Sequence, residues 1–338
     1  MGEFDLIERH FKAPARAMQA SDGVANNIAL GIGDDCALLQ PSTGMQLAIS
    51  SDMLVEGRHF FADVDPFKLG HKALAVNLSD LAACGAKPLA FTLALSLPNA
   101  DEAWLAPFSR GLLALAAEHN CALIGGDTTQ GPLNICITVF GEVPKNLALL
   151  RSGAKAGDDI YVSGTLGDAR LALEVMRGNL SLPAEAFAAA KARLETPTPR
   201  VTLGMALRGI ASSAIDISDG LLGDLGHILK QSQVGAVIDT SIAMHLIAVK
   251  ATNAAAKTQL IPQFTSQKQL QYVFSGGDDY ELAFTAPVAM RGAVQIAASR
   301  NFTKVTRIGQ IEAELGLRLT DAQGQPVSNN YGSFDHFQ

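Results

Sequence analysis

The sequence predicts an α+β protein of two domains, each with helices layered against a partly antiparallel sheet. Its 338 residues exceed what one hydrophobic core ordinarily holds. Strand-like and helix-like segments alternate in both halves, but without the regular strand–helix–strand period of a doubly wound parallel sheet. Between residues 144 and 158 the composition changes to Pro, Lys, Gly and Ser. We therefore expect domains at 1–145 and 146–338.

In the first half, two segments are the most informative. The apolar run 46–52 predicts a strand that ends in hydroxyls and a carboxylate. Pro66 suits the first turn of a helix, and the small apolar residues from 73 to 86 continue that helix to Gly85, a typical stop signal. The other elements predicted here are strands over 88–97, 121–124 and 133–143 and a helix over 101–119.

In the second half, strands again run into polar turns. The predicted elements, in order, are a strand over 160–163, alanine-rich helices to about residue 208, a strand over 213–216, a helix beginning at Leu221 and a strand over 282–285. Carboxylates lie next to the last two strands. Strand ends and glycine turns are common places for active sites, because the scaffold is rigid and the backbone can approach a ligand there.

Composition and charge exclude several classes of protein. With 48% hydrophobic and 17% charged residues, the chain is that of a well-buried globular protein. The net charge is −7 and no Lys/Arg cluster is evident, so we expect no nucleic-acid partner. The first residues lack the pattern of a signal peptide, and no uncharged apolar run reaches the roughly 18 residues of a membrane span. Four cysteines without paired spacing indicate free thiols in a reducing compartment. We expect a cytoplasmic protein that makes no membrane contact.

Aspartates recur at turns and strand ends throughout the chain. Hard cations such as Mg²⁺ take oxygen ligands, and several Mg²⁺ ions would offset repulsion among carboxylates and toward an anionic polyphosphate. Gly-Asp is also ordinary turn chemistry, so a single such site indicates little. Neither the phosphate-binding loop of P-loop proteins nor the dinucleotide-binding glycine pattern is present. The aspartates concerned are Asp34, Asp35, Asp52, Asp80, Asp127, Asp216, Asp219, Asp278 and Asp279.

Asp80 is the only charged residue between positions 73 and 86. A carboxylate in such an apolar helix must be paired, hydrogen-bonded or bound to a metal, because leaving it ionised and bare costs several kcal/mol. Asn77 lies one turn earlier on the same helix face. Two interpretations remain open. One is a shared metal site, and the other is a structural role in an internal ion pair or a helix-to-loop hydrogen bond.

Six ordered motifs extend over most of the chain. They are Gly31-Ile-Gly-Asp-Asp-Cys-Ala-Leu-Leu, Ala75-Val-Asn-Leu-Ser-Asp-Leu-Ala-Ala, Leu123-Ile-Gly-Gly-Asp-Thr-Thr, Arg151-Ser-Gly-Ala-Lys, Ala214-Ile-Asp-Ile-Ser-Asp-Gly and Ser275-Gly-Gly-Asp-Asp-Tyr-Glu-Leu. With these motifs the chain resembles the bacterial thiamine-monophosphate kinase family, in the fold superfamily of aminoimidazole-ribonucleotide synthetase and selenophosphate synthetase.

The resemblance implies ATP- and Mg²⁺-dependent phosphorylation of thiamine monophosphate to thiamine diphosphate. It implies catalytic roles for Asp35, Asp80, Asp127 and Asp216, and Mg²⁺ ligands at Asp35, Ser50, Ser51, Asp52, Asp80, Asp127, Asp216 and Asp219. ATP would contact Gly126, Asp127, Arg151 and Ser218, and thiamine monophosphate would contact His59, Asp278 and Tyr331. It further implies a homodimer whose N-terminal sheets pair into a shared barrel, with a mixed sheet and helices in the C-terminal domain.

Three positions depart from the family pattern. Ser51 stands where Thr is frequent, Asp278 where Glu is expected and Tyr331 where Trp is common. Two alternatives stay open at this point. One is another ATP-dependent synthetase of the superfamily, although the N-terminus lacks the reactive cysteine expected of selenophosphate synthetase. The other is a catalytically idle nucleotide- or metal-binding module, for which loss of the aspartates would be expected.

Overall fold

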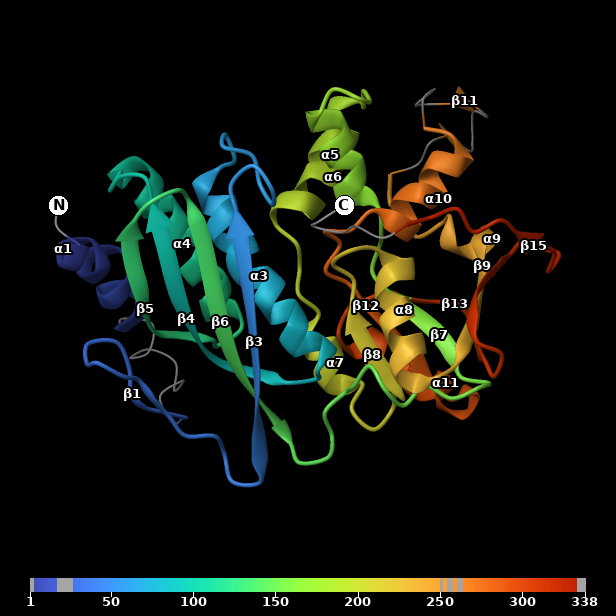
Figure 1. The fold of residues 1–338 in the computed structure, drawn as a ribbon, viewed down its shortest axis with the longest axis horizontal. Coiled ribbons are helices and arrows are strands. Elements are labelled where there is room, and N and C mark those ends of the chain that lie inside the picture. Colours follow the sequence, from blue (N-terminus) through green and yellow to red (C-terminus); the bar gives the residue numbers. More distant parts are fainter. Residues whose placement is uncertain (1–2, 17–26, 250–251, 254–257, 260–263, 333–338) are drawn as a thin grey trace. The chain divides into compact units, whose positions relative to one another are not determined.

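The computed structural model describes residues 3–16, 27–249, 252–253, 258–259 and 264–332 (Figure 1). By their contacts, the residues form two compact units. The first consists of Met1–Leu81 and Ala86–Ala148, and the second of Ala82–Gly85 and Leu149–Gln338.

The first unit is built on a four-stranded sheet in the order β3-β6-β4-β5. Its strands are β3 (Met45–Val55), β4 (Lys87–Leu97), β5 (Ala122–Gln130) and β6 (Asn134–Pro144). β6 is antiparallel to both neighbours, whereas β4 and β5 are parallel. The helices α3 (Pro66–Ala83) and α4 (Glu102–Glu118) lie behind the strands in the view of Figure 1. The smaller elements are α1 (Glu3–Ile7), the π-helical turn η1 (Glu8–Lys12), β1 (Ile28–Leu30) and β2 (Leu38–Leu39).

Helix α3 has the bounds expected from its sequence. It begins at Pro66, and Gly85 follows its end with a φ of 67°, a left-handed conformation that favours glycine. Leu74, Ala75 and Leu78 are fully buried. Their burial confirms that this is an interior helix and not a surface helix with one wet face.

Strand β5 is longer than predicted. A strand over 121–124 followed by a turn was expected, but β5 continues through the two glycines to Gln130. β4 pairs with it in parallel as far as Leu97 and Gln130, and a register shift between Phe91 and Thr92 passes over Ile124, so that Gly125 and Gly126 pair with Thr92 and Leu93. The expectation that Asp127 follows a strand end was therefore wrong, because Asp127 lies within the strand.

The second unit contains a seven-stranded mixed sheet in the order β15-β14-β9-β13-β7-β12-β8. Only the β14–β9 pair is parallel within this sheet. The strands are β7 (Asp159–Ser163), β8 (Ser213–Asp216), β9 (Gly235–Asp239), β12 (Leu282–Ala286), β13 (Val305–Glu312), β14 (Gly316–Thr320) and β15 (Pro326–Val327). A separate short pair joins β10 (Thr252–Asn253) to β11 (Thr258–Gln259).

Helices surround a core that contains Ile160, Ile217, Leu225 and Phe274. They are α5 (Asp168–Met176), α6 (Ala184–Glu195), α7 (Val201–Ala206), α8 (Leu221–Ser232), α9 (Thr240–Ala243), α10 (Ser266–Ser275), the 3₁₀ turn η3 (Val288–Met290) and α11 (Arg291–Arg300). Both units thus combine helices with partly antiparallel sheets, which confirms the α+β prediction.

Two further expectations concern the state of the cysteines and the presence of membrane spans. Each of the four cysteines is a free thiol. In the part of the chain that the structure describes, no helix has the length and apolar character needed to cross a membrane.

Candidate active site

Two carboxylates of the first unit lie close together, one on strand β3 and one on helix α3. Asp52 is on β3 and Asp80 is on α3, and the Ser50 hydroxyl donates a hydrogen bond to Asp80 Oδ2. The Asn77 side chain accepts a hydrogen bond from the Asp52 backbone N–H at 3.2 Å. Burial, and then the neighbouring Asp80 carboxylate, raise the pKa of Asp52 to about 7. Asp52 and Asp80 are therefore two carboxyl groups that the fold holds close together in a partly desolvated environment.

The chemistry of this donor set fits a magnesium ion. All the groups concerned are oxygen donors, and Mg²⁺ is ordinarily held by one or two carboxylates together with waters and substrate phosphates. Among the described residues, no three His, Cys, Asp or Glu side chains form a group that could hold a metal ion unaided. An ion held by Asp52 and Asp80 would thus take its remaining oxygens from water, hydroxyls or phosphates.

Ser51 does not share the face of Ser50 and Asp52. Successive side chains of a strand point to opposite faces, and the Ser51 hydroxyl is hydrogen-bonded to the Ile137 carbonyl at 3.1 Å and contacts the Thr138 hydroxyl at 3.0 Å. The same exposed face of β3 carries Leu47, Ile49 and Met53. The Ser51 side chain is thus separated from the carboxylate pair.

The other residues predicted for the first unit lie at three further places. Asp127 is exposed within β5, and its position pairs with Ala94 of β4. Asp35 is exposed between β1 and β2. His59 follows β3, and its Nδ1 accepts a hydrogen bond from the Val55 N–H at 3.0 Å, so Nε2 carries the proton of the neutral ring.

Gly126 has a structural reason to be glycine. A Cβ at this position would lie 1.9 Å from the Leu93 carbonyl oxygen. The close approach of β5 to β4 therefore excludes any side chain, whether or not a ligand also approaches the backbone here.

In the second unit, two loops that carry predicted site residues are hydrogen-bonded to each other. Asp216 ends β8 and is opposite Leu282 at the start of β12. Beyond this pair, the Ser218 carbonyl accepts a hydrogen bond from the Asp278 N–H at 2.8 Å. The structure thus brings Asp216, Ser218, Asp219 and Asp278 together at one edge of the sheet.

The conformation of the 277–280 loop is unusual. Asp278 and Tyr280 have φ values of 59° and 50°, a region that non-glycine residues rarely adopt. The Tyr280 hydroxyl donates to Asp278 Oδ1 at 3.3 Å. A backbone in this state persists only where its surroundings hold it, and such strain is common at functional sites.

Two buried groups hold this loop in place. Glu281 is fully buried and binds the guanidinium groups of Arg193 and Arg200, with the shortest nitrogen–oxygen distances at 2.8 and 2.5 Å. It also accepts a hydrogen bond from the Ser163 hydroxyl at 2.6 Å. Asp279 accepts the Gly167 N–H, and burial raises the pKa of this carboxyl well above its ordinary value. Sequence reasoning did not identify this network, since its arginines lie more than 80 residues from Glu281 in the chain.

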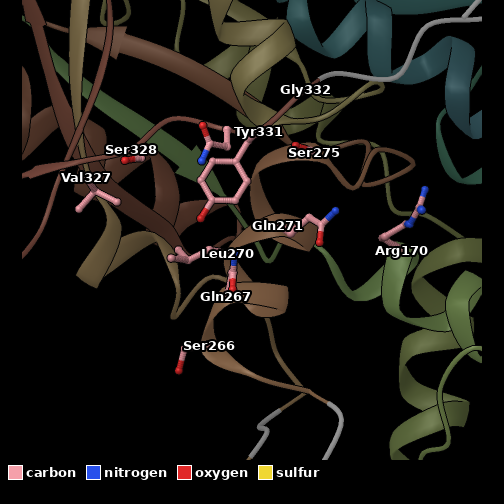
Figure 2. A pocket seen from close by; sticks show the side chains of 11 residues that line it. Arg170, Ser266, Gln267, Leu270, Gln271, Ser275, Val327, Ser328, Tyr331 and Gly332 are labelled. Atoms are coloured by element: carbon pink, nitrogen blue, oxygen red, sulfur yellow. The ribbon is translucent and has the colours of Figure 1, made fainter.

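Tyr331 lies on a cavity of about 790 Å³ in the second unit. Its ring meets the edge of Phe274, with ring centroids 5.1 Å apart. In Figure 2 the Tyr331 ring points toward Leu270 and Gln267. The Ser275 hydroxyl is buried and has no hydrogen-bond partner within the described residues. The remaining lining residues are Arg170, Ser266, Gln271, Val327, Ser328, Asn330 and Gly332.

Arg151 precedes β7 and has an exposed side chain. Its carbonyl accepts a hydrogen bond from the Ser232 hydroxyl at 3.1 Å. The predicted site residues are therefore distributed over both units. Within each unit, one close cluster forms, around Asp52 and Asp80 in the first and around Ser218 and Asp278 in the second.

Comparison with known proteins agrees with the motifs. The chain matches the model of "AIR synthase related protein, N-terminal domain" over residues 33–143 and that of the corresponding C-terminal domain over 155–322. It is 45% identical over 338 residues to the thiamine-monophosphate kinase of Escherichia coli strain K12, with 99% of this chain and 98% of that relative covered.

Solved structures give the same result. The crystal structure of thiamine-monophosphate kinase from Stenotrophomonas maltophilia K279a has a TM-score of 0.82 at 43% identity, covering 97% of this chain and 98% of that one. The complex of AaThiL with AMPPCP and TMP has a TM-score of 0.71 at 26% identity, covering 99% and 97%. The chain belongs to the thiamine-monophosphate kinase family.

Proposed function

We propose that this protein phosphorylates thiamine monophosphate to thiamine diphosphate, with ATP as the phosphoryl donor. The observation that carries the proposal is the Asp52–Asp80 pair, a metal-suited carboxylate site in a chain of this family. The similar AaThiL structure holds AMPPCP, an ATP analogue, together with TMP. These ligands match the two substrates that we propose.

The proposed chemistry needs little from the protein beyond charge and alignment. The acceptor is a phosphate oxygen, already mostly anionic near neutral pH because the second phosphate pKa is about 6. A general base is therefore not required, and the residues have to align two anions for in-line transfer. Mg²⁺, when bound, would neutralise phosphate charge.

We assign the roles of the chain's residues as follows. In the first unit, Asp52, Asp80 and the Ser50 hydroxyl would hold one Mg²⁺ ion, and Asp35 and Asp127 would serve other ions. Asp127 pairs through Ala94 and Cys136 with Met53, so it lies on the face of Ser51 and not on that of Asp52. Ser51 would contribute its backbone carbonyl only, because its side chain lies on the other face of β3. In the second unit, Asp216 and Asp219 would hold Mg²⁺. ATP would contact Gly126, Asp127, Arg151 and Ser218.

The cavity beside Tyr331 suits the thiamine end of the substrate. It combines an aromatic wall with amide and hydroxyl side chains, as small-molecule sites commonly do. Asp278 is on the loop that follows Ser275 of this cavity. We propose that Tyr331 and Asp278 contact thiamine monophosphate here, and we keep His59 as a proposed thiamine monophosphate contact in the first unit.

Product analysis tests this function. Incubation with ATP, Mg²⁺ and thiamine monophosphate is expected to give thiamine diphosphate and ADP in equal amounts, as measured by chromatography. Free thiamine is expected to give no product, since its hydroxyl requires a general base that an anionic phosphate does not. Aminoimidazole precursors and selenide serve as controls for the other superfamily activities. Consumption of ATP with either control, but not with thiamine monophosphate, would assign the protein to another reaction.

The exposed face of β3 is consistent with a homodimer. β3 is an end strand of its sheet, and Leu47, Ile49 and Met53 are 42%, 60% and 53% exposed. Long edge strands with exposed apolar side chains are prone to pair with another chain. We propose that the first units of two copies pair their sheets into a shared barrel, and that this exposed apolar face of β3 is buried in the pairing.

Arg151→Ala is expected to weaken ATP binding by about 10-fold or more while leaving thiamine monophosphate binding within about 2-fold. A charge-assisted bond to phosphate is ordinarily worth about 1.5–3 kcal/mol, which explains the difference. Arg300→Ala, which removes an exposed arginine at the end of α11, is the control. Each ligand is titrated separately by calorimetry. Unchanged ATP affinity and turnover in Arg151→Ala would show that the arginine plays no part in nucleotide binding.

A further inference from the structure

The loop 217–220, which carries Ser218 and Asp219, is fixed from two sides within the second unit. On one side, backbone groups of the 277–281 segment bond to it. The N–H groups of Asp278 and Tyr280 donate to the carbonyls of Ser218 and Ile217 at 2.8 and 2.9 Å. On the other side lies a single carboxylate, that of Asp224 in the first turn of α8.

Asp224 makes an unusual set of hydrogen bonds. One oxygen, Oδ2, accepts the N–H groups of Ser218, Asp219 and Gly220 at 3.0, 3.1 and 3.2 Å. The residue is only 4% exposed. Three consecutive N–H groups that converge on one atom fix the backbone orientation of the loop, and therefore the direction in which the Ser218 and Asp219 side chains leave it.

We propose that Asp224 is a positioning residue for the nucleotide and metal site, acting through the backbone of residues 218–220. The proposal rests on the roles proposed above for Ser218 and Asp219. Asp224 itself is not placed to contact a ligand, since it is buried and its Oδ2 already accepts three donors. Its influence reaches Asp278 as well, because the Ser218 carbonyl accepts the Asp278 N–H.

Geometry, more than charge, is what this arrangement requires. Asparagine has nearly the same shape, and its carbonyl oxygen can accept the same three N–H groups. Alanine offers no acceptor, and glutamate keeps the charge but moves the oxygen by one methylene. We therefore expect Asp224→Asn to bind the nucleotide with nearly the affinity of the wild-type protein. The affinities of Asp224→Ala and Asp224→Glu are expected to be well below it.

Asp239 provides a matched control in the same unit. Its carboxylate also accepts consecutive N–H groups, those of Ser241 and Ile242 at 2.8 and 3.4 Å, at the start of α9. It lies on β9, which three strands separate from β8 in the sheet. Asp239→Ala removes a comparable cap from a place where we assign no ligand.

The test measures two properties that do not depend on turnover. Hydrogen exchange of a peptide covering 217–222 is followed in the metal-free protein, and binding of AMPPCP with Mg²⁺ is measured by calorimetry. In Asp224→Ala the amides of 218–220 are expected to lose protection, and AMPPCP binding to weaken by about 10–100-fold, as is usual when the supporting partner of a metal ligand is removed. Asp224→Asn and Asp239→Ala are expected to stay within about 3-fold of wild type.

The binding data for these variants either support or overturn the role proposed for Asp224. If Asp224→Ala does not fold, Asp224→Glu replaces it with the same expected loss. Wild-type binding in folded Asp224→Ala or Asp224→Glu, equal loss in Asp239→Ala, or a loss in Asp224→Asn as large as in Asp224→Ala would overturn the proposal. A wild-type protein that binds Mg²⁺ and AMPPCP but does not phosphorylate thiamine monophosphate would contradict the proposed function and leave this inference standing.

Discussion

Asp80→Asn is expected to reduce turnover by at least about 100-fold, which corresponds to about 2.7 kcal/mol of activation free energy. The substitution keeps the volume of the side chain and removes one of the two charges that would hold Mg²⁺ beside Ser50. The measurement is the rate of thiamine diphosphate formation at saturating ATP and Mg²⁺. Asp101→Asn is the control, because Asp101 caps α4 through the Ala103 N–H and asparagine caps helices equally well.

Stability of the metal-free protein separates the two interpretations of Asp80. If it belongs to a strained carboxylate pair, Asp80→Asn relieves repulsion, and Tm in EDTA is expected to stay constant or rise. If it were half of a buried ion pair, the same change would cost about 3–5 kcal/mol. An early-melting Asp80→Asn protein that still turns over when folded would contradict the metal-site assignment.

The pH dependence of stability has a definite sign. The pKa of Asp52 is raised from 3.8 to about 7 on folding, so the folded protein binds the proton more tightly than the unfolded chain. This contribution to the free energy of unfolding is complete below pH 4 and is lost as pH rises to about 7. In Asp80→Asn, the loss between these pH values is expected to be smaller, because one cause of the raised pKa is removed. Thermal melting in EDTA across this range tests the difference.

Glu281→Gln is expected to produce the largest loss of stability. The substitution keeps the shape of the side chain but leaves Arg193 and Arg200, 20% and 18% exposed, without their shared negative charge. Breaking one partner of a buried ion pair ordinarily costs about 3–5 kcal/mol, a fall in Tm of roughly 6–20 °C in a unit of this size.

Glu312→Gln is the control for that measurement. Glu312 binds Arg318 at 2.5 Å, but both side chains are substantially exposed, so the expected change is below about 1 kcal/mol. Equal Tm values for Glu281→Gln and Glu312→Gln would show that the buried cluster does not stabilise the fold.

Local sequence signals predicted much of the first unit. Pro66 and Gly85 marked the ends of α3, and the apolar runs marked β3, β4 and β6. The extent of β5 could not be predicted, because glycines oppose strand formation locally and pairing with β4 overrides that preference. In the second unit, β7, β8 and β12 were predicted, whereas β9, β13 and β14 were not.

In the candidate site, too, the sequence identified residues but not their arrangement in space. The predicted end of the strand 46–52 singled out Asp52, and the motif that begins at Ala75 singled out Asp80, but the proximity of the two carboxylates depends on how α3 lies against β3, which no spacing reveals. Alternation along a strand does separate Ser51 from Ser50 and Asp52, so that distinction was available from the sequence. Asp224 is also recognisable in the sequence as a carboxylate in the first turn of a predicted helix. Its three N–H partners became evident only from the loop conformation.

The proposed reaction is tested most directly by the origin of the bridging oxygen in the product. Thiamine monophosphate labelled with ¹⁸O in its phosphate is incubated with unlabelled ATP and Mg²⁺, and the thiamine diphosphate is examined by ³¹P NMR. If a phosphate oxygen of thiamine monophosphate attacks the γ-phosphorus of ATP, the terminal phosphorus of the product shows the isotope shift of one ¹⁸O, and ADP contains none. An unshifted terminal phosphorus, or labelled inorganic phosphate as a co-product, would contradict direct transfer onto the substrate phosphate.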